Sequence, residues 1–188
     1  APALLGMRKL GVSVVVTVDC GTMSHEPLKI AKDAGLEVIV IDHHAAEVNL
    51  PVATAIVNPN RLDDISGQGH LAAVGVAFLL VVAVNRVLRN AGWYKTHKEP
   101  DLTQWLDIVA LGTVCDVVAL KGANRAFVRQ GLKVMAKRRN LGLNALADVA
   151  GLDERPSTFH LGFLMGPRVN AGGRIGLSKL GAQLLATE

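Results

Sequence analysis

The sequence predicts an α/β fold in which a parallel sheet is flanked by helices. Two apolar runs rich in β-branched residues, 12–18 and 36–41, are typical of buried strands. Between them, Ser24 can cap a helix that carries Pro27 in its first turn and ends at Gly35. A strand, a helix and a second strand in this order form a βαβ unit, so we expect parallel strands joined by a right-handed crossover.

The rest of the chain is predicted to be mainly helical. Residues 45–69 have the Pro, Asn and Gly content of a loop. Helices are expected over 71–90, 102–114, 124–139 and 143–149, with a last one from near Ser178 to Glu188. The apolar run 71–84 is too short to span a bilayer, and we expect a buried helix there.

The composition is that of a globular protein. Half of the 188 residues are hydrophobic and 19% are charged, which excludes a disordered chain. The net charge of +4 is compatible with an anionic partner such as nucleic acid but does not require one. Cys20 and Cys115 are far apart and lack a CxxC spacing, which favours a reducing cytoplasm over a disulfide framework. We expect both to be small buried fillers, with metal ligation as the alternative.

Polar side chains that can bind a metal follow both predicted strands. Asp19 comes directly after the first strand, and Asp42-His43-His44 directly after the second. Because ligands of such sheets bind at the carboxyl ends of the strands, we expect these groups to lie close together. Carboxylate with imidazole suits Mn²⁺ or Mg²⁺ better than a structural zinc site. The alternative for Asp19 is an ordinary turn residue, and Asp116 is a candidate for a further ligand.

Adjacent histidines project differently, so we expect His43 and His44 to have different tasks. One would ligate a cation, and the other would contact a phosphate or donate a proton. Asp42 would be either a ligand or a partner that orients an imidazole. Two cations about 3.5–4 Å apart can clamp a phosphate, but they need more ligands than Asp19, His43 and Asp116 supply. That deficit indicates further ligands upstream of Ala1.

The segment 166–174 is predicted to be a glycine-rich loop. Backbone N–H groups near its glycines can cradle an anion, and Arg168 and Arg174 can grip phosphate. The alternative is an ordinary turn with solvated arginines.

Taken in order along the chain, these motifs resemble the DHH phosphoesterase family, and within it the branch of single-strand-specific 5′→3′ exonucleases. Val18-Asp19-Cys20-Gly21 resembles the second motif of the family, Asp42-His43-His44 the third, and the segment 111–118 the fourth. Segments 71–78 and 166–174 resemble the exonuclease branch in particular. The first motif, of Asp-x-Asp-Gly type, and the glycine-rich motif of the family's second domain are absent from this sequence.

The resemblance implies a metal-dependent phosphodiesterase that uses two Mn²⁺ or Mg²⁺ ions on single-stranded DNA in recombination and repair. It assigns roles as follows: Asp19 bridging both ions, His43 and Asp116 holding the second ion, His44 and Asp42 at the catalytic centre, and Arg168, Asn170 and Arg174 on DNA phosphates. A DHH domain without its first motif would occupy 1–165. A phosphate-contacting loop and the start of a connector helix to a second domain would occupy 166–188.

Other functions remain open at this point. Close alternatives are DHH phosphodiesterases that act on short oligonucleotides, cyclic dinucleotides or pyrophosphate. An alternative of another class is a non-catalytic DHH-like scaffold for DNA or replication partners. A single-strand-binding protein or a helicase is a candidate protein partner, and no membrane association is expected. Because the chain starts without Met, we expect it to be a fragment, and because the first motif and the second-domain motif are missing we expect little or no activity from it by itself.

Overall fold

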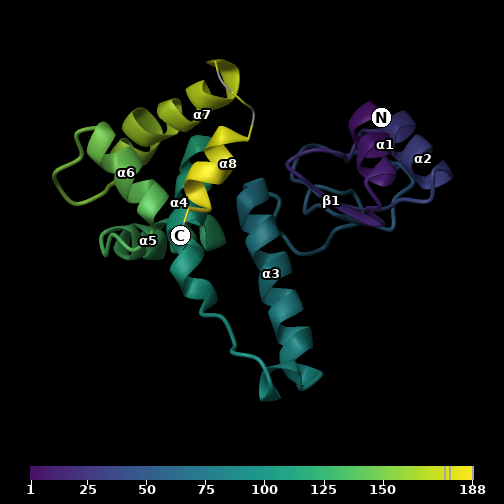
Figure 1. Cartoon of the computed structure of the whole chain (residues 1–188), viewed down its shortest axis with the longest axis horizontal. Coiled ribbons are helices and arrows are strands. Elements are labelled where there is room, and N and C mark those ends of the chain that lie inside the picture. The colour runs from purple at the N-terminus through teal and green to yellow at the C-terminus, as the bar shows by residue number, and fades with distance from the viewer. Residues whose placement is uncertain (176, 178, 188) are drawn as a thin grey trace. The chain divides into compact units, whose positions relative to one another are not determined.

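The structure, a computed structural model, describes residues 1–175, 177 and 179–187, and the chain divides into two compact units (Figure 1). Unit 1 comprises Ala1–Val81 and unit 2 comprises Val82–Glu188. Helix α3 (Ala73–Asn90) runs from one unit into the other. The boundary at residue 165, which the motifs suggested, stays a prediction.

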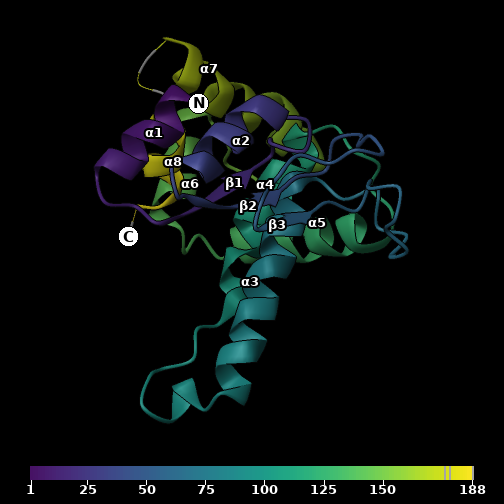
Figure 2. The ribbon, with the colours of Figure 1, turned by 90° about the vertical axis from the view of Figure 1, so that its right-hand side faces the viewer.

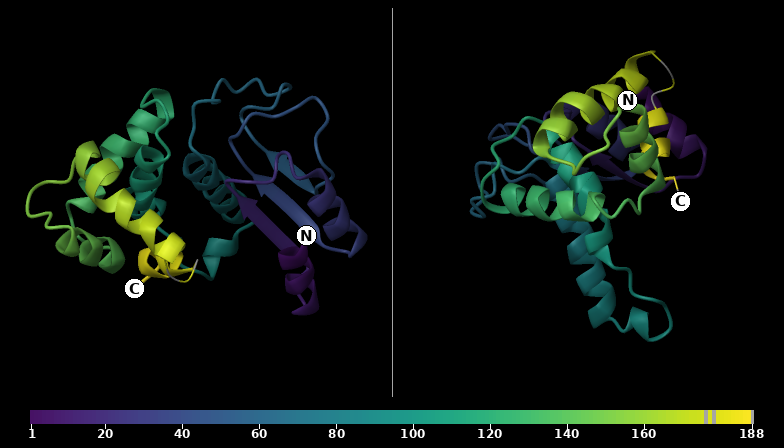
Figure 3. Two further views of the ribbon diagram at one scale, coloured as in Figure 1. Left: turned by 90° about the horizontal axis from the view of Figure 1, so that it is seen from above. Right: turned by 90° about the vertical axis from the view of Figure 1, so that its left-hand side faces the viewer.

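Unit 1 is built on a three-stranded parallel sheet in the order β1-β2-β3 (Figure 3, left). The two predicted strands are confirmed as β1 (Val14–Val18) and β2 (Glu37–Ile41). The third strand, β3 (Ala55–Val57), lies in the segment predicted to be a loop. Its three residues are too few to produce an alternating pattern, and it exists because β2 offers a parallel edge for pairing.

Helices α1 (Pro2–Lys9) and α2 (His25–Asp33) flank this sheet. As predicted, α2 begins after Ser24 and ends before Gly35, whose φ of +74° only glycine adopts without strain. The Ser24 side chain makes no cap hydrogen bond, so the predicted capping is not formed. The core of unit 1 joins the sheet to α2 through Val15, Leu28, Ala31, Leu36, Val38 and Val40, with Leu4 of α1 packed against it. The loops with Asp19 and Asp42 begin directly after the last paired residues of β1 and β2.

Unit 2 is helical. Its elements are the short η1 (Trp93–Lys95) and η2 (Leu102–Trp105), then α4 (Leu106–Cys115), α5 (Gly122–Met135), α6 (Leu141–Val149), η3 (His160–Met165), α7 (Gly166–Ile175) and α8 (Leu180–Leu185). The helices predicted over 102–114, 124–139 and 143–149 are therefore confirmed within a few residues. The predicted ends of the last helix, Ser178 and Glu188, lie outside the described residues.

The segment 166–174 is helical, so the prediction of a loop is wrong. It forms α7, which continues directly from the π-helical turn η3. Pro167 lacks a backbone N–H, and the preceding π turn relaxes the hydrogen-bond ladder where that donor is missing. Gly166 packs so closely on α4 that an added Cβ would lie 2.5 Å from Sγ of Cys115. Here glycine serves close packing, and not a loop conformation.

Helix α3 is only partly buried, whereas a buried helix was predicted for its apolar run. Ala73 and Val76 are buried, but Leu79 is 41% and Val84 49% exposed. Among the described residues, α3 is the one helix whose length and apolar composition would allow it to cross a bilayer. A single helix of this kind is weak evidence, because core helices of other proteins have the same properties.

We expect Gly131→Ala to destabilise unit 2 by about 3 kcal/mol, the upper end for overpacking. A Cβ at Gly131 of α5 would lie 2.0 Å from the backbone oxygen of Leu106, at the contact with α4. Urea denaturation would measure the change. The control is Gly172→Ala in α7, where a Cβ meets no atom within 4 Å and should stabilise by up to about 1 kcal/mol. Equal stabilities of the two variants would contradict this account of the α4–α5 contact.

Candidate metal centre

Three loops meet at the carboxyl edge of the sheet in unit 1. Val18 pairs in register with Ile41, and Ile41 with Val57, so the three strands end at the same level. Asp19 follows β1, Asp42 follows β2 and Asn58 follows β3. The structure thus brings the polar residues of two separate sequence motifs to one place, where ligands bind in sheets of this kind.

Asp19 has an unusual backbone conformation, with a φ of +64°. Its N–H still donates to the carbonyl oxygen of Ile41 at 2.9 Å, so the residue is the last one held by the sheet. A left-handed conformation costs a residue with a Cβ roughly 1–2 kcal/mol. The strain turns the exposed carboxylate out of the strand direction, and strained residues of this kind cluster at functional sites.

Asp19, His43 and His44 form a group with metal-ligating geometry. One ligand atom from each lies within 4.8 Å of the others, and Nε2 of His43 is 3.3 Å from Oδ1 of Asp19. Nδ1 of His43 lies 3.0 Å from the carbonyl oxygen of Leu71, which can only accept a hydrogen bond. Nδ1 is therefore the donor in this contact, and Nε2 is the ring atom that faces the carboxylate, as in a metal-ligating histidine.

His44 lies nearer to His43 than the sequence suggested. The two imidazole rings meet edge to face with their centroids 4.7 Å apart. Nδ1 of His44 donates to Oδ1 of Asp42 at 2.7 Å, and the ring is 60% exposed. An exposed imidazole that is oriented by a carboxylate suits contact with a substrate phosphate or ligation of a cation. The expectation that the two histidines have different tasks stays a prediction.

Asp42 is buried and surrounded by hydrogen-bond donors. Its side chain is 2% exposed and accepts from the backbone N–H groups of Thr22 at 2.9 Å and His43 at 2.8 Å, in addition to the ring of His44. Burial by itself would raise the pKa of Asp42. The hydrogen bonds from Thr22, His44 and His43 outweigh it and hold that pKa well below its ordinary value. Of the two roles considered for Asp42, the geometry favours the one that orients an imidazole.

Three residues that hold these loops together were not predicted from the sequence: Thr22, Asn58 and Asn60. Nδ2 of Asn58 donates to Oγ1 of Thr22 and to the carbonyl oxygen of His44, each at 2.9 Å. Nδ2 of Asn60 donates to the carbonyl oxygen of His43. The signal was the pair of asparagines in Asn58-Pro59-Asn60 directly after Ala55–Val57, which is visible only once that segment is recognised as a strand.

The remaining predicted site residues belong to unit 2. Asp116 ends α4 with its N–H donating to the carbonyl oxygen of Gly112 at 3.0 Å, and Val117 follows at a φ of +59°. The backbone therefore turns sharply at Asp116, as expected for a residue that presents its side chain at the end of a helix. Asp116 belongs to unit 2, whereas Asp19 and His43 belong to unit 1, and its role as a common ligand with them stays a prediction.

The predicted phosphate-binding residues lie on α7. Asn170 and Arg174 lie four positions apart and share one face of the helix, whereas Arg168 lies on a different face. One N–H of the Arg168 guanidinium donates to the carbonyl oxygen of Leu164 at 2.7 Å. A single strand can therefore not meet all three side chains along one straight line of the helix, and their contact with phosphates stays a prediction.

The two cysteines differ in environment. Burial raises the pKa of the Cys115 thiol, and Cys115 fills the contact between α4 and Gly166 as expected. Cys20 is exposed, so its prediction as a buried filler is wrong. It follows the strained Asp19 and lies outside the core of the sheet, because the turn carries it past the end of β1. Neither cysteine belongs to the metal-ligating group found among the described residues.

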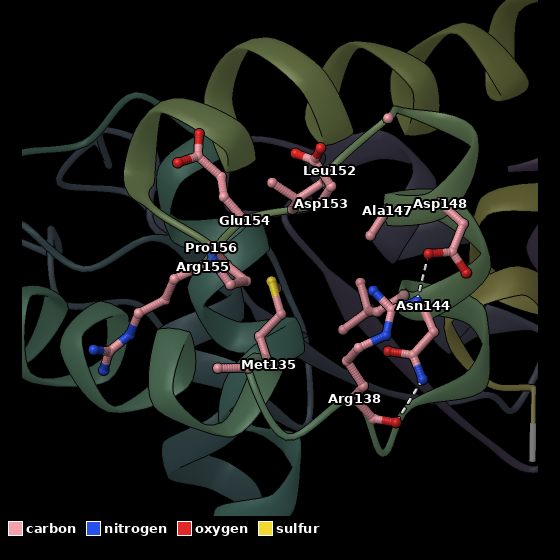
Figure 4. A pocket seen from close by; sticks show the side chains of 13 residues that line it. Met135, Arg138, Asn144, Ala147, Asp148, Leu152, Asp153, Glu154, Arg155 and Pro156 are labelled. Carbon is pink, nitrogen blue, oxygen red and sulfur yellow. Dashed lines mark hydrogen bonds and ion pairs between the residues drawn. The ribbon is translucent and has the colours of Figure 1, made fainter.

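Unit 2 also contains a cavity of about 690 Å³, between the end of α5, α6 and the segment 151–156 (Figure 4). Apolar side chains, among them Leu143 and Leu152, line it together with an ion pair between Arg138 and Asp148. None of the predicted site residues lines this cavity. The cavity and the metal-ligating group are therefore separate features.

Residues 4–113 match the model of the DHH family, N-terminal domain, and the chain belongs to this family. The chain is 42% identical over 179 residues to the single-stranded-DNA-specific exonuclease RecJ of Escherichia coli K12, which covers 93% of this chain and 31% of that protein. It is 35% identical over 187 residues to RecJ of Bacillus subtilis 168, which covers 99% of this chain and 22% of that protein. The chain thus spans a third or less of the length of these curated relatives.

Solved structures confirm the predicted fold class. A crystal structure of exonuclease RecJ bound to manganese matches with a TM-score of 0.81 and 30% identity, over 98% of this chain and 44% of that one. RecJ of Thermus thermophilus in complex with Mn²⁺ matches with the same TM-score and identity, over the whole of this chain and 27% of that one. The match includes α3, which favours its interpretation as an ordinary element of the fold.

We expect Asp42→Asn to lower the free energy of unfolding at pH 7 by about 3 kcal/mol, because charge-assisted hydrogen bonds to a buried carboxylate are lost. The folded-state pKa of Asp42 is depressed, so its contribution is present above the unfolded value of about 3.9 and is lost as the pH falls toward the folded value. The gap between wild type and variant should therefore narrow below about pH 4.

Denaturant titrations from pH 7 to pH 3 in the presence of a chelator would measure this gap. The control is Asp33→Asn, which removes a surface ion pair with Lys29 and should change stability by less than about 1 kcal/mol at any pH. A gap for Asp42→Asn that stays constant down to pH 3 would show that this carboxylate does not titrate with a lowered pKa.

Proposed function

We propose that this chain is the metal-binding core of a single-strand-specific 5′→3′ exonuclease that hydrolyses phosphodiester bonds in DNA with Mn²⁺ or Mg²⁺. The observation that carries the proposal is the grouping of Asp19, His43 and His44 at the carboxyl edge of the sheet. It is supported by 42% identity to the single-stranded-DNA-specific exonuclease of E. coli and by the likeness to RecJ structures that contain manganese or magnesium. On this proposal the protein acts in recombination and repair in the cytoplasm.

The donor set of the site fits a divalent cation. Mixed carboxylate and imidazole ligands suit Mn²⁺, and the hydrogen bond to Leu71 already orients the ring of His43 with Nε2 toward Asp19. Asp19 and His43 would hold the cation, with Asp116 as a further ligand. When bound, such a cation polarises the phosphate and lowers the pKa of a nearby water.

The other residues of the site would position the substrate. His44 is held by Asp42 and remains exposed, so it would contact the scissile phosphate. Asp42 would orient that ring and would not exchange protons near neutral pH, because its pKa is far below its ordinary value. Arg168, Asn170 and Arg174 would contact other phosphates of the strand. A single-strand-binding protein or a helicase would be a suitable partner for supplying single strands.

Release of nucleotides from a 5′-labelled single strand in Mn²⁺ tests this proposal, with matched duplex and pyrophosphate as controls. The 188-residue chain would be compared with a longer version extended at both ends to the span of its relatives. We expect the longer version to release nucleotides from the single strand only. His43→Ala and Asp116→Ala should each lower the rate at least roughly 100-fold, beyond the 10–100-fold typical of residues behind the ligands. Calorimetry of each variant, for Mn²⁺ affinity and for thermal unfolding, would distinguish the loss of metal binding from the loss of folding.

Two results would contradict the proposal. Undiminished activity of His43→Ala or Asp116→Ala would defeat the metal assignment. The absence of hydrolysis of every substrate by a longer version that binds Mn²⁺ would favour a non-catalytic scaffold.

We expect Arg168→Ala to weaken single-strand binding and to reduce the salt slope of the affinity by about 0.7, the value for one phosphate contact with a single strand. Fluorescence anisotropy of a labelled strand between about 50 and about 200 mM salt would measure it. The control is Arg129→Ala, an exposed arginine of α5 without a proposed contact. An unchanged slope for Arg168→Ala would return this residue to the role of a solvated arginine.

A further inference from the structure

The end of α3 and the chain that follows it, residues 85–99, form a basic and aromatic hairpin end, which we call the α3 tip (Figure 2). It lies entirely in unit 2. The segment contains one carboxylate, that of Glu99, and four cationic side chains: Arg86, Arg89, Lys95 and Lys98. The sequence motifs assign no function to this segment, and none of its residues belongs to the group of Asp19, His43 and His44.

A hydrogen-bond network holds the tip in one conformation. The buried side chain of Asn85 donates to Glu99 at 2.9 Å and accepts from the hydroxyl of Tyr94 at 2.5 Å. The guanidinium of Arg89 also donates to Glu99 through Nε at 2.9 Å. These contacts tie both ends of the turn to the last two turns of α3, so the side chains between them are presented on a fixed backbone.

Trp93 forms an exposed aromatic platform on this backbone. Its ring stacks on that of His97 with centroids 4.0 Å apart and planes 7° from parallel, and Nδ1 of His97 is held near the carbonyl oxygen of Trp93 at 3.1 Å. Even so, Trp93 remains 49% exposed. An indole that is supported on one face and exposed is available for stacking with a further flat ring.

The charge around this platform is positive. Arg89 is neutralised by Glu99, whereas Arg86, Lys95 and Lys98 make no ion pair within the part of the chain that the structure describes. A flat aromatic surface in the same short segment as cations with no carboxylate partner is complementary to a nucleobase followed by its phosphates.

We propose that the α3 tip binds single-stranded nucleic acid, with an unpaired base stacked on Trp93 and backbone phosphates held by Lys95, Lys98 and Arg86. A duplex hides the faces of its bases, so an exposed indole favours a single strand. The choice of a DNA strand as the natural ligand rests on the proposed function. The tip would then give the substrate strand a second point of attachment, apart from the metal centre.

Tryptophan fluorescence tests this proposal directly. The chain has two tryptophans, so Trp105→Phe leaves Trp93 as the only tryptophan, whose emission is excited selectively over that of Tyr94. We expect oligothymidylate, added to this variant of the 188-residue chain in EDTA, to quench the emission with saturation. Trp93→Leu should weaken binding of a labelled strand roughly tenfold, the effect of losing one stacked base. Lys95→Ala combined with Lys98→Ala should lower the salt slope by about 1.4, because two phosphate contacts are lost.

The matched control combines Lys133→Ala with Lys137→Ala, two lysines of unit 2 outside the tip, and should leave quenching and slope unchanged. The lysine variants spare the aromatic packing, so they test the tip even where Trp93→Leu alters folding. Absent quenching, equal quenching by a duplex, or quenching by anionic phospholipid vesicles but not by the strand would each overturn the proposal. EDTA prevents hydrolysis, so the quenching experiment measures strand binding without nuclease activity. Its result therefore holds even if the nuclease assay fails. If variants of the tip still bound the strand unchanged in an active nuclease, the proposal for the tip would fail and the proposed function would stand.

Discussion

The carboxylate of Asp42 is the interaction on which the candidate metal centre depends. It lies buried at the end of β2 and accepts hydrogen bonds from the loop after β1 and from its own two histidines. Burying a carboxylate costs free energy unless its oxygens accept hydrogen bonds. The folded loops therefore strongly favour the arrangement in which Asp42 accepts them. The two histidines are therefore placed by a residue that need not touch a metal or a substrate.

The sheet gives this interaction its position. Parallel pairing brings the ends of three strands to one level, and the asparagines after β3 close the arrangement from the other side through Thr22 and the backbone of His43 and His44. Asp19 adds a carboxylate in a strained conformation that the sheet hydrogen bond to Ile41 maintains. The hydrogen bonds are thus concentrated in the supporting loops, whereas the side chains of Asp19 and His44 remain exposed.

The sequence predicted what depends on local pattern and composition. The strands at 12–18 and 36–41, the helix between them and three helices of unit 2 follow from apolar periodicity and capping residues, which act over short distances. The grouping of Asp19 with His43 also followed from the rule that parallel strands end at one edge. Strand β3 and the helical conformation of 166–174 depend on tertiary contacts, an open edge of β2 in one case and close packing of Gly166 in the other. For that reason the supporting role of Asn58 was not predicted.

The motif Asp42-His43-His44 is a structural unit as well as a set of functional groups. Because Asp42 accepts from the backbone N–H groups of the next two residues, the tripeptide closes into a small ring of its own, an Asx turn. A glutamate has one methylene group too many for this ring, so conserving charge alone would not preserve the turn. The side chain that orients the imidazole of His44 thereby also folds the peptide that carries it. The order of the three residues is consequently a requirement of backbone geometry, independent of which metal or substrate the protein binds.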